Sequence, residues 1–189
     1  IGIKNWGREI KLFCHCPALV NDESEPSVSF TRKLRVAAGE LGVLDKAALY
    51  EVKKGKTYAY DACATSSCLV EFDEEPPFSV NKDALHVALE IALLLHAKIV
   101  EEIHFMRKTV IDGSNVSAFQ RSALVATDGY IDTNKGRVAI PSICLEEEAA
   151  KKIQEKPHVV QYRLDRLGVA LIEIATDASI KDPEHAKEV

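Results

Sequence analysis

The pattern of hydrophobic and polar residues predicts two helices in the first half of the chain. Residues 45–52 carry apolar side chains at helical spacing behind Asp45, whose carboxylate can cap a helix. Residues 81–99 begin with a second capping residue, Asn81, and are apolar on nearly every face. We therefore predict a short amphipathic helix at 45–52 and a long, central, buried helix at 81–99.

Short β-prone runs account for most of the remaining chain. Residues 57–61 and 67–73 predict a hairpin or a paired edge. Further strands are expected at residues 104–111, 121–127, 130–133, 137–145, 159–165 and 169–175.

Glycine-containing joints favour antiparallel hairpins between these strands. They occur at residues 112–113, 128–129 and 134–136. Helices are expected to follow Ala149 and Pro183. Strands in hairpins with segregated helices predict an α+β fold with a mostly antiparallel sheet.

Composition and charge narrow the class of protein. The 189 residues are 47% hydrophobic and 28% charged, enough to bury a core. Polar residues interrupt the longest apolar stretch, residues 85–97, so we expect a cytosolic protein without a membrane span or secretory leader. The net charge of −5 argues against a broad nucleic-acid-binding face, because RNA backbones are met by clustered Lys and Arg.

Glu173 is the most informative single residue. Its strand, residues 169–175, is otherwise apolar on both faces. Because a buried bare carboxylate costs several kcal/mol, Glu173 should have a cation, an Arg or a proton as its partner. A structural ion pair with Arg163 or Arg166 and a role in a functional site are both open.

Three consecutive glutamates, residues 146–148, lie where a strand is predicted to end. Alternation places Glu146 and Glu148 on one side and Glu147 on the other. For Glu147 and Glu148 the dipole of a following helix is the preferred explanation. Glu146 is the residue expected to point into a site, and carboxylates from neighbouring strands are suited to Mg²⁺.

Arg107 and Lys108 are adjacent in a predicted strand and point to opposite faces. One of them can therefore meet a phosphate beside a metal, as phosphoryl transfer requires. On spacing alone, solvent-exposed charge is the simpler interpretation. The sequence contains neither a Walker loop nor a Rossmann fingerprint, so a nucleotide site must be of another design.

The five cysteines predict reduced thiols or metal-bound thiolates rather than disulfides. Cys14 with Cys16, and Cys63 with Cys68, could together form an all-cysteine zinc site. Their spacing departs from paired C-x-x-C, so a zinc site and ordinary semi-buried thiols both stay open. Cys144, between two apolar neighbours, is expected in the core.

Specific motifs occur at six places along the chain. They are KLFCHCP at 11–17, CLVEFDEEPP at 68–77, MRKTVIDGSN at 106–115, LEEEA at 145–149, LDRLG at 164–168 and LIEIAT at 171–176. With these motifs the chain resembles the archaeal GatE family of glutamyl-tRNA(Gln) amidotransferase subunits along nearly its whole length. The related bacterial GatB family shares the skeleton of the motifs at 145–149 and 164–176 but lacks those at 73–77 and 107–115.

The resemblance implies a fold akin to glutamine synthetase and the guanido kinases, with an ATP and Mg²⁺ site on a curved antiparallel sheet. It implies that residues 1–189 are part of the catalytic (cradle) domain of a longer protein, without the helical and tail domains that bind tRNA. In that family, ATP phosphorylates the glutamyl γ-carboxylate of misacylated Glu-tRNA(Gln). Ammonia from an asparaginase-like partner subunit, GatD, then displaces phosphate.

By motif matching, Glu146 and Glu173 fall on the carboxylates that bind Mg²⁺. The remaining assignments are Arg107, Lys108 and Arg166 for catalysis, and Lys108, Ser114 and Gln120 for nucleotide binding. The family begins with a Gly-Leu-Glu-Ile-His-type strand that completes the metal site, and residues 1–10 do not contain it. An alternative is a non-catalytic, zinc-stabilised scaffold that docks the partner subunit, and binding of ATP and Mg²⁺ separates the two.

Overall fold

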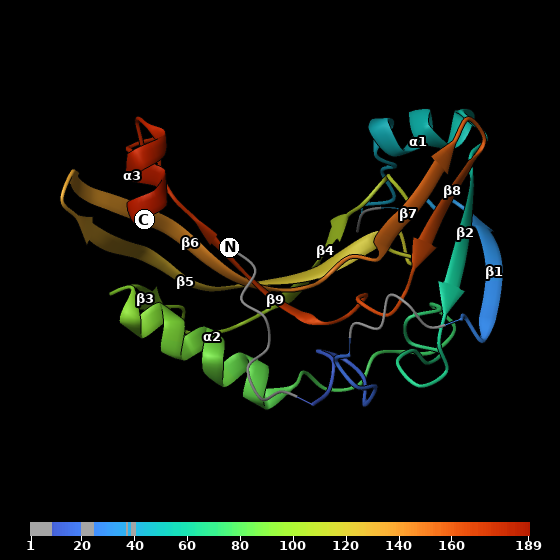
Figure 1. Ribbon diagram of the computed structural model, residues 1–189, viewed down its shortest axis with the longest axis horizontal. Coiled ribbons are helices and arrows are strands. Elements are labelled where there is room, and N and C mark those ends of the chain that lie inside the picture. The colour runs from blue at the N-terminus through green and yellow to red at the C-terminus, as the bar shows by residue number, and fades with distance from the viewer. Residues whose placement is uncertain (1–8, 20–24, 37, 39–40) are drawn as a thin grey trace.

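The computed structural model describes residues 9–19, 25–36, 38 and 41–189, which form two β-sheets with three helices (Figure 1). The first sheet contains β3 (Lys98–Ile99), β4 (Phe105–Thr109), β5 (Phe119–Thr133), β6 (Gly136–Glu147) and β9 (Ala170–Ala175). The second contains β1 (Val28–Lys33), β2 (Thr57–Ala62), β7 (Lys151–Lys156) and β8 (Val159–Arg163). The helices are α1 (Lys46–Lys53), α2 (Lys82–Leu94) and α3 (Pro183–Glu188).

The five-stranded sheet is antiparallel throughout, in the order β3-β5-β6-β9 with β4 also paired to β5. Figure 1 shows it as a curved floor, with α2 beneath and the four-stranded sheet rising at one end. The β5–β6 hairpin turns at Asn134 and Lys135, where the sequence predicted a turn.

The joint at Asp128 and Gly129 is not a turn, contrary to the prediction. Strand β5 continues through it in regular register with β6, with Asp128 at a positive φ of 57° inside the strand. Gly129 lies where a Cβ would be 2.9 Å from the Cβ of Ala97. The missing side chain lets the segment after α2 pack directly on the strand.

Helix α2 begins after Asn81, whose side chain caps the first turn as predicted. Its end and its burial differ from the prediction, since it stops at Leu94 and covers one face of the sheet only. Leu93 and Leu94 are 63% and 77% exposed. The buried residues of the helix are Ala84, Ala88 and Ala92. These small side chains let the helix lie close to the sheet, over a core that includes Val125, Ile143, Leu145 and Ile172.

The four-stranded sheet has the order β1-β2-β8-β7, in which β2 and β8 are parallel and the other pairs antiparallel. The helix predicted after Ala149 is absent from this described region, because Lys151–Lys156 pairs with β8 as strand β7. Residues 67–73 are turns rather than the predicted strand. There the Glu71 carboxylate accepts a hydrogen bond from the backbone nitrogen of Cys68, which closes the chain locally.

Residues 110–118 link the two sheets by packing against the tyrosines of the four-stranded sheet. The hydroxyl of Tyr60 donates to the carbonyl of Gly113 (2.7 Å), and that of Tyr162 to the carbonyl of Asp112 (2.7 Å). Gly113 has φ of +84°, and a Cβ there would be 2.1 Å from the ring of Tyr58. Glycine is therefore required where the loop crosses the ring.

The fold is α+β and mostly antiparallel, as predicted. Helix α1 follows its predicted cap, Asp45, and α3 begins at Pro183. The described helices are all too short or too polar to cross a membrane. Residues 1–8, where the resemblance would place the first metal-binding strand, lie outside the described part of the chain.

Candidate functional site

Glu146 and Glu173 lie on neighbouring strands and meet at the ammonium group of Lys108. Strand β6 pairs with β9 so that Cys144 is opposite Glu173 and Glu146 is opposite Leu171. The Nζ atom of Lys108, from β4, is 2.8 Å from Glu146 Oε1 and 4.0 Å from Glu173 Oε2. The two carboxylates therefore lie on neighbouring strands and face the same lysine, and their assignment as a metal pair stays a prediction.

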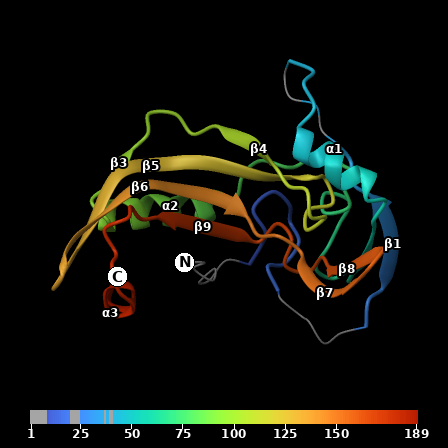
Figure 2. The same ribbon diagram turned by 90° about the horizontal axis from the view of Figure 1, so that it is seen from above.

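This site face points away from α2. Leu145 and Ile172, which alternate with the site residues, belong to the core beneath the sheet. The site face is thus the side of the curved sheet that Figure 1 shows as concave, seen from above in Figure 2. No helix among the described residues packs on it as α2 packs on the other face.

The two carboxylates have different environments. The side chain of Glu146 is 3% exposed and accepts hydrogen bonds from Lys108 and from the hydroxyl of Ser122. The side chain of Glu173 is 53% exposed, so the prediction that it is buried is wrong. The neighbours of Glu173 in the sequence are apolar, but the face of β9 that carries Glu173 is open to solvent.

Neither arginine proposed from the sequence is the partner of Glu173 in the contacts described. Arg166 pairs with Glu148 at 3.1 Å, and Arg163 pairs with Asp165 at 2.8 Å. The cation beside Glu173 is Lys108. Burial alone would lower the pKa of Lys108, but the hydrogen bond to Glu146 and the charges of both carboxylates raise it above its ordinary value.

The other residues assigned from the motifs lie around this cluster rather than in it. Arg107, next to Lys108 in β4, points to the opposite face, where its guanidinium lies over the ring of Phe119. The Ser114 hydroxyl donates to the carboxylate of Asp112, and Gln120 donates to the backbone carbonyl of Glu147 (2.6 Å). Their proposed roles in catalysis and nucleotide binding stay predictions.

Glu147 has a structural partner of a kind that the sequence did not suggest. Its carboxylate accepts hydrogen bonds from Arg121 Nη1 (2.9 Å) and from the Arg121 backbone nitrogen (3.1 Å). These contacts lie on the face of the sheet opposite Glu146. Burial raises the pKa of Glu147, although Arg121 opposes this shift. The predicted helix dipole plays no part, because the following residues form β7.

Ser122 and Cys144 belong to the site face and were missed. Cys144 was expected in the core, but it is only partly buried and lies beside Glu173. Burial and the charges of Glu146 and Glu173 raise the pKa of its thiol. Alternation could have placed Cys144 with Glu146, two residues away on the same strand; Ser122 required knowledge of the register.

A second cluster lies below the sheets, where Cys14, Cys16, Cys68 and Glu71 converge. One ligand atom from each lies within 4.8 Å of all the others. Cys14 Sγ donates to Glu71 Oε1 at 2.9 Å, and the wholly buried Lys11 lies 3.5 Å from the same oxygen. Burial, reinforced by the charge of Glu71, raises the pKa of the Cys14 and Cys16 thiols. The pKa of Cys16 is raised to about 12.

The donor set of this cluster fits zinc. Three sulfurs and one carboxylate oxygen supply the four ligands that a tetrahedral zinc site uses. The group of ligand atoms found together contains Glu71 and does not contain Cys63, which was predicted as the fourth ligand. The sulfur of Cys63 accepts a hydrogen bond from Arg163 Nη2 at 3.3 Å. Glu71, three residues after Cys68, takes the fourth position, and a C-x-x-E spacing was the missed signal.

Comparison with known proteins gives the same family as the motifs. Residues 7–189 match the family described as GatB/GatE catalytic domain. GatE subunits of glutamyl-tRNA(Gln) amidotransferase are similar: the one from Methanocaldococcus jannaschii is 51% identical over 178 residues, that from Pyrococcus abyssi 53% over 179 and that from Methanosarcina acetivorans 50% over 179.

These alignments cover 94–95% of this chain, which spans only 28% of the length of each relative. The family model extends across both sheets and both side-chain clusters described above. The chain therefore belongs to the GatB/GatE catalytic domain family.

Proposed function

We propose that this chain carries the ATP-dependent step of a glutamyl-tRNA(Gln) amidotransferase. In this step the γ-carboxylate of the glutamyl group on misacylated Glu-tRNA(Gln) takes the terminal phosphoryl group of ATP. Ammonia from the asparaginase-like partner subunit GatD then attacks the acyl carbon, and phosphate leaves as Gln-tRNA(Gln) forms. The observation that carries the proposal is the meeting of Glu146, Glu173 and Lys108 on an open sheet face in a chain of this family.

The carboxylates of Glu146 and Glu173 fit Mg²⁺, because they are hard oxygen donors on adjacent strands with an open side toward solvent. Bound there, Mg²⁺ would neutralise charge on the phosphates of ATP. Ser122 holds Glu146 in position, since its hydroxyl donates to the carboxylate. The ammonium group of Lys108 can move from the carboxylates toward a phosphate and stabilise its negative charge.

The thiol cluster supports a separate, structural role. With Cys14, Cys16, Cys68 and Glu71 as ligands, zinc would connect residues 11–17 to residues 68–77. Such a site would stabilise the domain without taking part in phosphoryl transfer. A purely structural, zinc-stabilised scaffold that docks the partner subunit is the competing function, and it predicts no affinity for ATP.

Calorimetric titration with ATP and Mg²⁺ tests the proposal. The protein should bind both, and E146Q and E173Q should weaken Mg²⁺-dependent binding of ATP. The matched control is E102Q, which removes an exposed carboxylate paired with His104. In the assembled enzyme, E173Q should lower the rate of Gln-tRNA(Gln) formation ~30- to 1,000-fold, while ammonia production by the partner persists. Absence of ATP binding by the unaltered protein would favour the scaffold.

A further inference from the structure

Charge is distributed unevenly between the two sheets. Residues 25–36, 41–63 and 148–168, which contain the four-stranded sheet and α1, have 12 Lys and Arg against 7 Asp and Glu, a net charge of +5. The rest of the chain has 12 against 22, a net charge of −10. The overall value of −5 is therefore an average over a basic and an acidic region.

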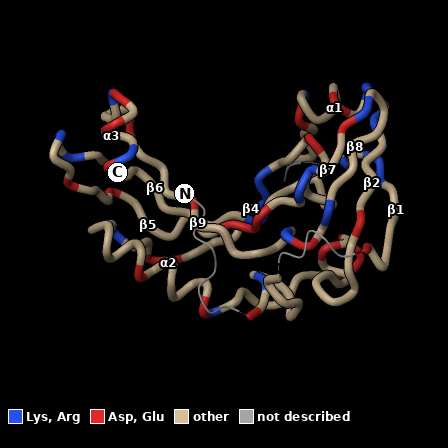
Figure 3. Tube along the Cα trace, in the orientation of Figure 1, with Lys and Arg blue, Asp and Glu red and all other residues tan. Residues whose placement is uncertain are grey.

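Several basic residues lie at one end of the four-stranded sheet, and Figure 3 colours such positions blue along the trace. Across the strands, Lys33 pairs with Thr57, Thr57 with Val159, and Val159 with Lys156. Each edge strand therefore has a lysine at this end of the sheet, Lys33 in β1 and Lys156 in β7. We define the lysine end by these two residues, the lysines at the end of α1 and in the α1–β2 connection, and Lys152 of β7. It consists of Lys33, Lys53, Lys54, Lys56, Lys152 and Lys156.

Only part of this positive charge is neutralised by neighbouring carboxylates. Glu155 lies between Lys56 (2.8 Å) and Lys152 (3.0 Å), and Glu51 pairs with Lys54. Within the described ranges, the other three lysines have no carboxylate partner, and all three are exposed. They are Lys33, Lys53 and Lys156.

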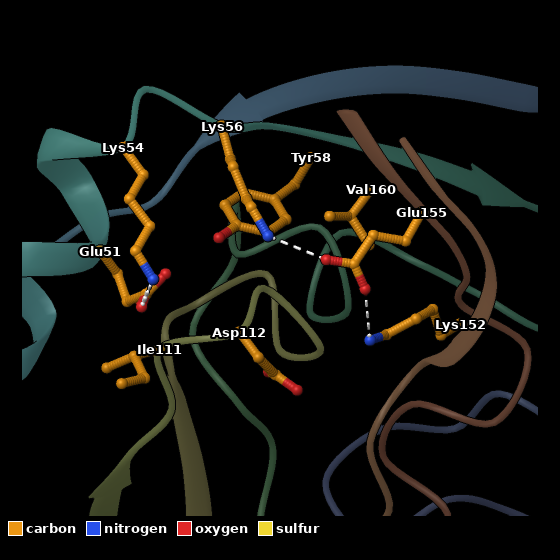
Figure 4. A pocket seen from close by; sticks show the side chains of 9 residues that line it. All are labelled: Glu51, Lys54, Lys56, Tyr58, Ile111, Asp112, Lys152, Glu155 and Val160. Carbon is orange, nitrogen blue, oxygen red and sulfur yellow. Dashed lines mark hydrogen bonds and ion pairs between the residues drawn. The ribbon is translucent and has the colours of Figure 1, made fainter. Parts of the chain in front are cut away.

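A pocket of about 230 Å³ opens among these residues, shown in Figure 4. Lys54, Lys56 and Lys152 line it, together with Tyr58 and Asp112. The ion pairs that cross it are solvent-exposed and therefore weak, so a polyanion can displace Glu155 from its two lysines at little cost.

We propose that the lysine end binds the phosphate backbone of RNA, and specifically that of the tRNA substrate. The row crosses four strands, roughly 14 Å at ~4.8 Å per strand, which matches several phosphates of a nucleic acid. Figure 1 shows α1 and the tip of β7 standing above the concave side of the five-stranded sheet. RNA held there by its backbone would lie beside the site face. The inference rests on the proposed function, which supplies the RNA.

A salt-dependent tRNA titration tests the assignment. The variant K33Q/K53Q/K156Q should bind a tRNA transcript roughly 10- to 100-fold more weakly at ~0.1 M salt. The slope of log affinity against log salt should fall by about 2 to 3. The control K98Q/K181Q/K187Q removes the same charge from exposed lysines outside the basic region and should change binding much less. In the opposite direction, E155Q should tighten binding by releasing Lys56 and Lys152.

Equal weakening by both triple variants, or none by the first, would overturn the assignment. Unchanged tRNA binding combined with loss of binding to a polyglutamate peptide would assign the lysine end to an acidic protein instead, and would overturn it too. ATP and Mg²⁺ titrations of the first triple variant separate this inference from the proposed function. They should match the unaltered protein, and a failure of ATP binding in both proteins would count against the proposed function alone.

Discussion

The two sheets place their charged residues in opposite ways. On the five-stranded sheet, Lys108 meets carboxylates from two neighbouring strands, and one of them, Glu146, is buried. On the four-stranded sheet, lysines are spread over an exposed end, and both they and their carboxylate partners are at least partly exposed. The first arrangement suits the positioning of one ion and one reacting group. The second suits a long, flexible polyanion.

The difference shows that the net charge of the chain does not describe the charge of either sheet. A value of −5 argued against a nucleic-acid-binding face, yet a region of +5 lies within the same chain. Binding of a polyanion depends on local charge, because at physiological salt charges more than ~8 Å away are largely screened. The sum over the chain therefore says little about either sheet.

Gly113 joins the two regions, and its substitution should have the largest effect on stability. In G113A the new methyl group would meet the ring of Tyr58 at 2.1 Å, at a φ of +84° that L-residues avoid. We expect a loss of about 3 to 5 kcal/mol from overpacking and backbone strain together. Urea unfolding measures it. The control is G136A, which also has a positive φ but open space around it, and should cost about 1 to 2 kcal/mol.

Equal losses of unfolding free energy in G113A and G136A would contradict the close packing of Gly113 against the ring of Tyr58. The two sheets would then be less closely coupled through residues 110–118 than the contacts of this loop indicate.

Substitutions at the thiol cluster should separate Glu71 from Cys63 as a zinc ligand. E71Q should lower zinc affinity at least ~10- to 100-fold, the range seen even for residues that only support a ligand. C63S should leave zinc content unchanged, since Cys63 lies beside Arg163 and outside the cluster. Metal analysis after dialysis against a graded chelator measures both. Loss of zinc in C63S with retention in E71Q would restore the four-cysteine site.

Much of the fold could be predicted where one local signal dominates. Asp45 and Asn81 cap helices, and Asn134 begins a hairpin turn, because these signals act within a few residues. One error occurred where a distant contact decides. Residues 151–156 were predicted as part of a helix but pair with β8. The turns at residues 69–73 were missed for a different reason, since the hydrogen bond from the Cys68 backbone nitrogen to Glu71 is itself local.

The candidate site shows the same division. Alternation along one strand correctly separated Glu146 from Glu147, but it could not show that Lys108 lies between Glu146 and Glu173. That contact depends on the pairing of β4 with β5 and of β6 with β9. The exposure of Glu173 could not be predicted from the local sequence pattern either, because it depends on which face of the sheet α2 covers.

Removing Lys108 should sharpen the contrast between a site for one cation and a surface for many phosphates. Without nucleotide, the ammonium competes with a metal for Glu146 and Glu173, so K108M should bind Mg²⁺ or Mn²⁺ roughly 10-fold more tightly. With ATP present the sign should reverse, because the phosphates lose a positive partner. Calorimetry measures both, with K98M as the control. Weaker metal binding by K108M without ATP would show that Lys108 organises the carboxylates instead of competing for them.

The smallest effect is expected from the exposed pair of lysines around Glu155. The hydrogen bond from Lys56, and then that from Lys152, lower the pKa of Glu155 from 4.5 to about 2 in the folded protein. Because the folded pKa lies below the unfolded one, the pairing stabilises the fold above pH ~4.5 and is lost as the pH falls toward 2. The unfolding midpoint in urea should therefore be slightly higher for the unaltered protein than for E155Q at pH 6. The difference should shrink through pH 3 and be reduced at any pH by added salt, since these side chains are exposed.

E101Q, which removes an exposed carboxylate without an ion-pair partner in the described ranges, should show no such dependence. A difference between E155Q and the unaltered protein that is as large at pH 2.5 as at pH 6 would mean that Glu155 acts through packing in β7. The lysine end would then be less easily opened to phosphates than its ion pairs suggest.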